Sequence, residues 1–186
     1  MEEVIIRKAR EEDIPAVAEV NLASLPENYW YGFYKEFVEK WGEAFLVAEV
    51  DGKIVGYVMS RIEYHRDPTL LGLRDELNEV PKPLMNKLAE DVISYLTSEQ
   101  QKVGHLVSIA VLASYRGRGI GSRLLAESIR VVRDIYEAIS MYLEVRVSNY
   151  VAVRLYEKFG FRKVRLARGY YSDGEDAYIM VKRLRV

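Results

Sequence analysis

The chain has 186 residues, enough for one sizeable hydrophobic core and short for two. Its 27 basic and 28 acidic residues leave a net charge of −1, so charge gives no reason to expect nucleic acid or a membrane surface as a partner. No apolar run approaches the length that spans a bilayer. No basic-then-apolar segment opens the chain, so we expect a cytoplasmic protein.

The absence of cysteine narrows the chemistry further. With no cysteines, the chain has no disulfides, no thiolate nucleophile and no cysteine-based metal site. The two histidines, His65 and His105, do not have the spacing of metal ligands. We therefore expect no metal site, and any group transfer must proceed without an acyl-cysteine intermediate.

The first 60 residues alternate between strand and helix patterns. Residues 4–7 indicate a short strand, and residues 11–22 a helix with acids in its first turn and Pro15 near its start. Residues 25–31 form an expected loop that is dense in aromatic side chains. Residues 45–59 then predict an antiparallel hairpin, turned at Asp51-Gly52.

The composition changes from residue 65 to residue 103. Three prolines interrupt a polar stretch, and within it an apolar face predicts one helix, marked by Leu84, Leu88, Val92, Tyr95 and Leu96. A loop this long is expected to carry structure of its own. We interpret residues 65–103 as a helical insertion between the third and fourth strands, within a single domain that spans residues 1–186.

The stretch from residue 107 to residue 135 organises the rest of the chain. An apolar strand at residues 107–112 leads into Arg116–Gly121, where three of the last five residues are glycine, and then into a long amphipathic helix. The apolar face of that helix is expected to comprise Ile120, Leu124, Leu125, Val131, Val132 and Ile135. Exposed backbone amides at a helix start favour an anion, and arginine suits phosphate, so this loop predicts a pyrophosphate site.

Two other glycine-rich phosphate loops do not fit this segment. A P-loop requires a Lys-Ser/Thr pair after its last glycine, whereas Gly121 is followed by Ser122-Arg123. The dinucleotide fingerprint requires a different glycine spacing within an early βαβ unit. Glu144 lies at a distance that imitates the ribose-binding acid, and we interpret it as a structural residue or a contact of a catalytic group.

The last third predicts a strand, a short helix and two more strands. Residues 141–147 indicate a strand, and Asn149 is a good N-cap for a helix over residues 150–159 that stops at Gly160. Residues 161–171 and 177–184 are expected to be strands joined through residues 172–176.

Two motifs in this order resemble a known family. Arg116-x-x-Gly119-x-Gly121 resembles the acetyl-coenzyme A motif of the GCN5-related N-acetyltransferases, and residues 148–161 are similar to the second signature of that family. The resemblance implies an α/β (α+β) fold: a mixed, mostly antiparallel sheet of about seven strands flanked by helices. Strands four and five of this fold splay around acetyl-coenzyme A.

The resemblance also implies a set of residues that bind the coenzyme. They are Ile109, Ala110, Val111, Arg116, Gly117, Arg118, Gly119, Ile120, Gly121, Ser122, Asn149 and Tyr156. In the family, Asn149 bonds the pantetheine arm, a backbone amide within residues 109–111 meets the oxyanion, and Tyr156 protonates the leaving thiolate. The competing interpretation of Tyr156 is a core aromatic residue with a satisfied hydroxyl.

Two further segments resemble one branch of the family, the protein N-terminal acetyltransferases. Residues 25–29 and 170–178 look like the paired signatures of the catalytic subunit of the N-terminal acetyltransferase A complex and its archaeal counterparts. A slot for the first residues of a peptide is thereby implied, lined by Leu25, Pro26, Glu27, Tyr29, Tyr170 and Tyr171. Tyrosine hydroxyls can bond a peptide backbone, although these tyrosines could also be merely structural among the 14 of the chain.

The resemblance leaves two candidates for the general base. Glu27 and His105 match the base candidates of archaeal members, and we expect Glu27 to be the base before His105. An α-amino group has a pKa near 8, so a weak base acting through water suffices. Taken singly, a loop glutamate is usually solvated, and a histidine at a strand start is more often a polar end residue.

The sequence therefore predicts an enzyme that transfers acetyl from acetyl-coenzyme A to the N-terminal α-amino group of proteins by direct attack. The alternatives are an acetyltransferase for a ribosomal protein or a small amine, and a non-catalytic coenzyme A-binding scaffold. The expected partner is the N-terminal segment of protein substrates, preferably with serine, alanine or threonine first, and with methionine as the alternative. The resemblance leaves open an auxiliary subunit or the ribosome as a further partner.

Overall fold

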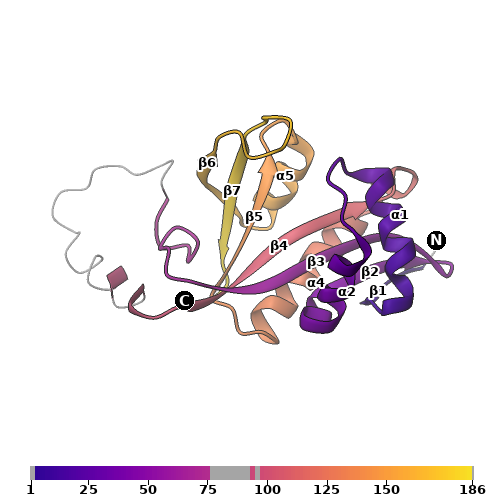
Figure 1. The fold of residues 1–186 in the computed structure, drawn as a ribbon, viewed down its shortest axis with the longest axis horizontal. Helices are drawn as coiled ribbons and strands as arrows, with labels where there is room; N and C mark the ends of the chain where they lie inside the picture. Colours follow the sequence, from indigo (N-terminus) through magenta and orange to yellow (C-terminus); the bar gives the residue numbers. More distant parts are fainter. Residues whose placement is uncertain (1–2, 76–92, 95–96, 186) are drawn as a thin grey trace. The chain divides into compact units, whose positions relative to one another are not determined.

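The computed structural model describes residues 3–75, 93–94 and 97–185. Its helices and strands follow one another along the chain as Figure 1 shows: β1 (Val4–Lys8), α1 (Ile14–Ser24), α2 (Tyr31–Trp41), β2 (Phe45–Val50), β3 (Lys53–His65), β4 (Gln101–Val111), α4 (Ile120–Asp134), β5 (Ser140–Arg146), α5 (Tyr150–Lys158), β6 (Arg162–Ala167) and β7 (Ala177–Arg183). Short 3-10 helices occupy Glu11–Asp13, Gly42–Ala44 and Ala113–Tyr115. The five residues that mark the helix predicted from Leu84 to Leu96 lie outside the described residues, whereas residues 93–94 and 97–98 are described and helical.

The strands form one hydrogen-bonded sheet in the order β1-β2-β3-β4-β5-β7-β6. β1 with β2, β2 with β3, β5 with β7 and β6 with β7 pair antiparallel, whereas β4 and β5 pair parallel. The predicted mixed, mostly antiparallel sheet of seven strands is therefore confirmed. The β4–β5 ladder consists of three residue pairs and ends at His105 and Tyr142, although β4 continues to Val111 and β5 to Arg146.

The chain divides into two compact units. The first comprises residues 1–61 and 106–135, and the second comprises residues 62–105 and 136–186. The division falls within β3 and within β4, so each of these strands contributes to both units. The predicted splay of β4 from β5 concerns strand segments in different units, and it stays a prediction, as does the single domain.

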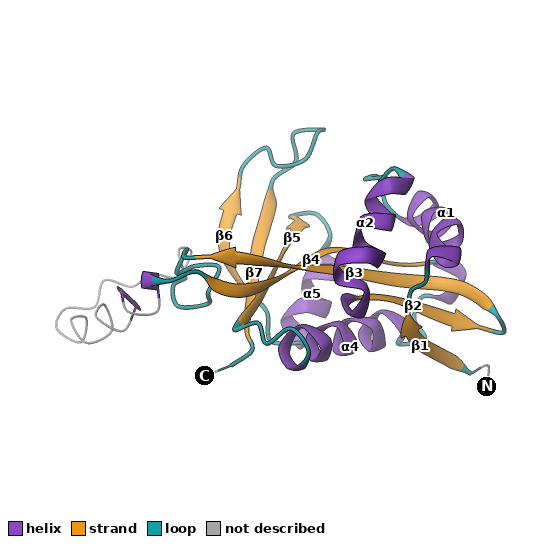
Figure 2. Ribbon diagram, turned by 60° about the horizontal axis from the view of Figure 1, so that its bottom comes forward, coloured by secondary structure: helices purple, strands orange, loops and turns teal. Residues whose placement is uncertain are grey.

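The first unit has helices on both faces of its strands. Side chains alternate along β3: Tyr57 and Met59 belong to the core that α1 and α2 cover, whereas Ser60 bonds Ser128 of α4 at 2.9 Å. Figure 2 shows α1 and α2 on one side of these strands and α4 on the other. A hairpin closes at Asp51-Gly52 with positive φ at both residues, as a tight two-residue turn requires.

The second unit contains β5, β6, β7 and α5, and a turn after β3 packs into its core. Leu70 and Leu71 lie in a buried cluster with Val103, Tyr142, Val164 and Val181. The Ser140 hydroxyl donates to the Leu70 carbonyl at 2.7 Å, and Arg165 pairs with Asp67 at 3.0 Å. The start of the expected insertion, residues 67–71, is therefore integrated into this unit.

Two local predictions need correction, and one helix was not predicted. Ile135 lies beyond the end of α4 and is 53% exposed, so it is not part of the apolar face that the other five residues form. The strand expected over residues 161–171 ends at Ala167, because Gly169 adopts a φ of +58° and its amide bonds the Asp176 carboxylate at 2.7 Å. The helix α2 has no counterpart among the predicted elements, although Tyr34 and Phe37 share a buried face at helical spacing.

Candidate active site

The glycine loop has the backbone shape that an anion site requires. Gly117 and Gly119 have φ values of +76° and +78°, and a Cβ atom at either position would meet no described atom within 4 Å. Gly119 is the N-cap of α4, so the first-turn amides of Ile120, Gly121 and Ser122 have no partner within the helix. An open, uncrowded helix start with a positive dipole end fits the pyrophosphate of coenzyme A.

Arginine side chains hold the loop from within. The Arg116 Nε donates to the carbonyl of Val111, the last residue of β4, at 2.9 Å. Arg118 donates to the Ser114 carbonyl at 3.3 Å and lies 5.0 Å from the centre of the Tyr115 ring. Both guanidinium groups therefore brace the turn and also supply positive charge beside the free amides. Ile109, Ala110 and Val111 form the last part of the strand that leads into it.

Asn149 and Tyr156 lie at opposite ends of α5 in the second unit. The Asn149 side chain caps the helix by accepting from the Ala152 amide at 3.2 Å, as predicted. The Tyr156 ring is buried and meets Phe161 edge to face at 5.9 Å. Burial raises the pKa of Tyr156 above its ordinary value of 10, so the phenol stays protonated.

The segment Leu25–Tyr29 joins α1 to α2 in the first unit and is fixed by its own contacts. Asn21, fully buried in α1, donates from Nδ2 to the Glu27 carbonyl at 3.1 Å and to the Tyr57 hydroxyl at 2.8 Å. The Tyr29 ring stacks on Phe33 at 4.6 Å. These contacts hold the backbone of Glu27 in place, although the residue itself is only partly buried.

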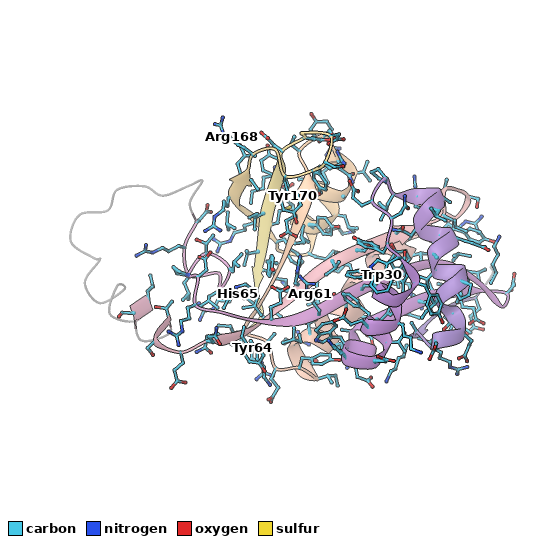
Figure 3. All side chains as sticks on the ribbon, in the orientation of Figure 1. Trp30, Arg61, Tyr64, His65, Arg168 and Tyr170 are labelled. Carbon is cyan, nitrogen blue, oxygen red and sulfur yellow. The ribbon has the colours of Figure 1, made fainter. Side chains whose placement is uncertain are left out.

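Tyr170 and Tyr171 lie in the loop between β6 and β7, in the second unit. Tyr170, labelled in Figure 3, is 49% exposed and meets Tyr171 edge to face at 5.0 Å. Arg146, at the end of β5, stacks 4.0 Å from the Tyr171 ring and pairs with Asp173 and Glu175 at 2.8 Å each. The contacts of Arg146 therefore hold this loop against the end of β5.

His105 lies between two carboxylates in the second unit. Its Nδ1 bonds Glu63 at 3.1 Å and its Nε2 bonds Glu144 at 2.8 Å. Glu63 also accepts from the Tyr142 hydroxyl at 2.6 Å and from the His65 Nε2 at 2.8 Å. Carboxylates only accept hydrogen bonds, so this arrangement favours a hydrogen on both ring nitrogens of His105, which is the imidazolium form.

The ionisation of this cluster follows from its contacts. Burial by itself lowers the pKa of His105, but the hydrogen bonds and charges of Glu144 and Glu63 outweigh it and raise the pKa above the ordinary 6.5. The hydrogen bond from His105 lowers the pKa of Glu63 well below its usual range, against the opposing effect of burial, and the bonds from Tyr142 and His65 reinforce it. At neutral pH, His105 is therefore a weaker candidate for a proton acceptor than its isolated position in the sequence indicated.

Several residues of the site were not predicted from the sequence. In each of these contacts the two residues are more than 20 positions apart in the sequence, so no local pattern reveals Glu63, Tyr142, Asn21 or Arg146. Glu144 was singled out for its spacing from the glycine loop, and its contact with His105 agrees with a contact of a catalytic group. The sequence gives little signal for Glu63, because it lies in the polar last part of β3 together with Arg61 and His65.

Sequence comparisons place this geometry in a family. The model of the Acetyltransferase (GNAT) family matches residues 10–161. An N-alpha-acetyltransferase of the archaeon Sulfurisphaera tokodaii is 43% identical over 179 residues, which cover 96% of this chain and 92% of that protein. The N-terminal acetyltransferase A complex catalytic subunit NAA10 of Arabidopsis thaliana is 33% identical, covering 98% of this chain and 79% of that protein.

Solved structures agree with the sequence comparisons. Ard1 from Thermoplasma volcanium matches with a TM-score of 0.73 at 25% identity, over 98% of this chain and 99% of that one. Naa20 of Chaetomium thermophilum, in complex with a bisubstrate analogue, matches with a TM-score of 0.71 at 29% identity, over 97% of this chain and 86% of that one. The chain therefore belongs to the acetyltransferase (GNAT) family, whose co-substrate is acetyl-coenzyme A.

Proposed function

We propose that the protein is an N-terminal α-acetyltransferase, which transfers acetyl from acetyl-coenzyme A to the α-amino group of proteins. The observation that carries the proposal is the 43% identity, over nearly the full length of both chains, to archaeal N-alpha-acetyltransferases. The open glycine loop at the start of α4 supports the choice of donor, because its free amides suit a pyrophosphate. The Leu25–Tyr29 and Tyr170–Tyr171 segments support a peptide as acceptor.

The reaction is a direct transfer in a ternary complex. The neutral amine attacks the thioester carbonyl carbon, a C–N bond forms, and the C–S bond then breaks. The base takes a proton from the amine nitrogen, and Tyr156 donates a proton to the departing sulfur. Backbone amides of residues 109–111 are proposed to bond the developing oxyanion, and Asn149 to bond the pantetheine arm.

Glu27 is the proposed base, with His105 second. A carboxylate is ionised at neutral pH, and the α-amino group needs only about 1 kcal/mol to lose its proton there. His105, by contrast, has both ring nitrogens engaged by carboxylates, and its pKa is raised. It therefore becomes competent as a base only as the pH rises through that pKa.

The acceptor side is proposed to be lined by Leu25, Pro26, Glu27, Tyr29, Tyr170 and Tyr171. Tyrosine hydroxyls can bond a peptide backbone without reading its side chains, and Tyr170 is 49% exposed. A cytoplasmic location is proposed, because new N-termini emerge there, and the ribosome or an auxiliary subunit is a proposed partner. Within the described residues, no helix is both long and apolar enough to cross a membrane.

A panel of peptides tests the proposal. Peptides that differ only in the first residue, each with a free or a blocked N-terminus and an internal lysine, are incubated with acetyl-coenzyme A and analysed by mass spectrometry. We expect acetylation of free α-amines, most rapidly with serine, alanine or threonine first. Acetylation of the lysine ε-amine alone would contradict the proposal, and an inert protein that still binds coenzyme A would favour a scaffold.

The proposed base has a matched control. Glu27→Gln removes the carboxylate charge at similar size, and we expect kcat/KM to fall by about 10²-fold at neutral pH. Glu19→Gln is the control, because Glu19 is an exposed carboxylate on α1, the helix that precedes the same loop. Equal activity of the two variants would remove Glu27 from the mechanism.

A further inference from the structure

One carboxylate, Glu63, has no role in the steps proposed above, yet it organises the surroundings of His105. It lies on β3, and its two oxygens accept from three side chains: Oε1 from His105, and Oε2 from Tyr142 and His65. Only 21% of its side chain is exposed. A charge that is withdrawn from water and bonded by three donors has a defined geometry, so it can impose that geometry on its partners.

We propose that Glu63 is a positioning residue: its carboxylate fixes the ring plane of His105 and holds that ring in its protonated form against Glu144. His105 thereby acts as a fixed cation between two carboxylates at neutral pH and is released as a base only at higher pH. The geometric part concerns the second unit alone, and only the kinetic consequence rests on the proposed function.

The ring plane of His105 is determined on three sides. Its two nitrogens are bonded to Glu63 and Glu144, and its face stacks on Tyr142 with ring centres 4.3 Å apart and planes 12° apart. His105 and Tyr142 are paired across the β4–β5 ladder. Since the Tyr142 hydroxyl also binds Glu63, one carboxylate holds both rings of the stack.

The charges that face His105 come from the two neighbouring strands. β3 contributes Glu63 and the half-buried His65, labelled in Figure 3 near the end of that strand, and β5 contributes Glu144 and the Tyr142 phenol. Two carboxylates stabilise one imidazolium. The bond to Glu144, at 2.8 Å, has the typical length of a charge-assisted hydrogen bond, and the bond to Glu63, at 3.1 Å, is slightly longer. Removing the charge of Glu63 should therefore make the His105 proton easier to lose.

The direct test is an NMR titration of the full-length protein. The chain has only two histidines, so two ring Cε1–H signals are expected, and His65→Gln assigns them. In Glu63→Gln, which keeps the size and one acceptor oxygen of the side chain, we expect the His105 titration to move to lower pH. An unchanged His105 titration in a folded Glu63→Gln protein overturns the proposal.

The matched control is Glu49→Gln. Glu49 is likewise a strand carboxylate in an ion pair, with 24% of its side chain exposed, and its partner is Arg7 at 2.8 Å. We expect the His105 titration to be unchanged in this variant. If both variants shift it equally, the effect is a general loss of negative charge and the proposal fails.

A second variant gives a change of the opposite sign. Tyr142→Phe keeps an aromatic ring for the stack and removes the hydroxyl that donates to Glu63. Without that hydroxyl, fewer donors share the negative charge of Glu63, and its attraction for the His105 proton is stronger. We therefore expect the His105 titration to move to higher pH. This variant decides the question if Glu63→Gln does not fold: a shift to lower pH, or no shift, contradicts the role of Glu63.

The kinetic test uses the Glu27→Gln background, where His105 is the remaining proposed base. There we expect the rise of kcat with pH to follow the His105 titration, and the added Glu63→Gln change to move that rise to lower pH. Loss of ring alignment should also lower the plateau of kcat by about 10- to 100-fold, with KM for acetyl-coenzyme A unchanged. If the His105 titration shifts and the rise of kcat with pH does not, Glu63 keeps its role toward His105, and His105 is excluded as a base.

Discussion

At the scale of single residues, Tyr156 combines a position in the core with a proposed role as the acid. Its ring is 5% exposed and packs against Phe161, which agrees with the core interpretation. Burial is the single cause that raises the pKa of its hydroxyl, and no hydrogen bond contributes to that shift. Because burial keeps the phenol protonated, it is suited to donate a hydrogen to a thiolate.

Removal of that hydroxyl should therefore affect the rate and spare the stability. In Tyr156→Phe we expect kcat to fall by about 10²-fold, while the free energy of unfolding changes by less than about 1 kcal/mol because no bond within the described structure is lost. Steady-state kinetics and urea unfolding measure the two quantities. Tyr150→Phe, at a position 70% exposed on the same helix, should leave kcat unchanged; a wild-type rate in Tyr156→Phe would exclude the acid role.

At the scale of elements, the glycine loop illustrates a backbone conformation that serves a ligand. Gly119 adopts a left-handed φ of +78° exactly one residue before α4, which turns the first amides of the helix outward. Gly52, in the β2–β3 hairpin, has nearly the same φ of +76° but no ligand role. Substitutions at these two glycines can therefore separate the cost of the left-handed backbone from an effect on coenzyme binding.

Gly119→Ala and Gly52→Ala should cost similar stability and differ in binding. A Cβ meets no described atom within 4 Å at either position, so each variant should lose about 1–2 kcal/mol from the left-handed backbone alone. Only Gly119→Ala should raise KM for acetyl-coenzyme A, by about tenfold, which corresponds to about 1.4 kcal/mol. Equal KM values in the two variants would argue against the loop as the coenzyme site.

The segment between α1 and α2 depends on a buried amide. Asn21 links α1 to the Glu27 carbonyl and, through the Tyr57 hydroxyl, to Ser108 on β4 at 2.7 Å. The bonds join four separate parts of the first unit. Asn21, which lies outside the proposed peptide-binding segment, therefore holds that segment in position through the Glu27 carbonyl.

Asn21→Ala should weaken peptide binding together with stability. Loss of the buried amide leaves the Glu27 carbonyl without this donor, and we expect a loss of about 1–3 kcal/mol in the free energy of unfolding. KM for a peptide substrate should rise while KM for acetyl-coenzyme A stays constant. Glu19→Ala is the control, since Glu19 is exposed on the same helix and lies outside the segment; equal peptide KM values in both variants would contradict the supporting role.

At the scale of the whole molecule, the net charge of −1 does not reveal that several ionisable groups form close ion pairs. Glu63 and Asp13 have lowered pKa values, through His105 and Arg7 respectively, and His105 has a raised one. A carboxyl with a lowered pKa stabilises the fold above its unfolded pKa and loses that contribution as the pH falls. A histidine with a raised pKa stabilises the fold below about 6.5 and loses that contribution as the pH rises through the folded value.

The free energy of unfolding should therefore be highest between about pH 4.5 and 6.5. Urea unfolding across a pH series measures it, with a slope of at most about 1.4 kcal/mol per pH unit for each proton. On the alkaline side of this window, Glu63→Gln should show a shallower decline than the wild type, because the variant stabilises the His105 cation less. Glu49→Gln should keep the wild-type decline, and a flat wild-type profile from pH 6.5 upward would contradict the assignment.

The sequence by itself determined much of the donor side of this enzyme. The hairpin at Asp51-Gly52, the glycine loop and the cap at Asn149 follow from short-range rules, because turn, loop and cap geometry depends on residues within four positions of one another. The same local rules failed where distant contacts intervene. Gly169 and Asp176 end β6 early, and α2 forms because Tyr34 and Phe37 find a core to bury them.

The tertiary structure alone decided the state of the ionisable groups. His105 could be called a base from its position in the sequence, but Glu63 and Glu144, 42 and 39 positions away, make it a cation. The pKa of a buried group depends on the charges within a few ångströms, and strand pairing brings those charges together without any trace in the neighbouring residues. The sequence thus determined which groups are present, and the fold decided which of them carry a proton.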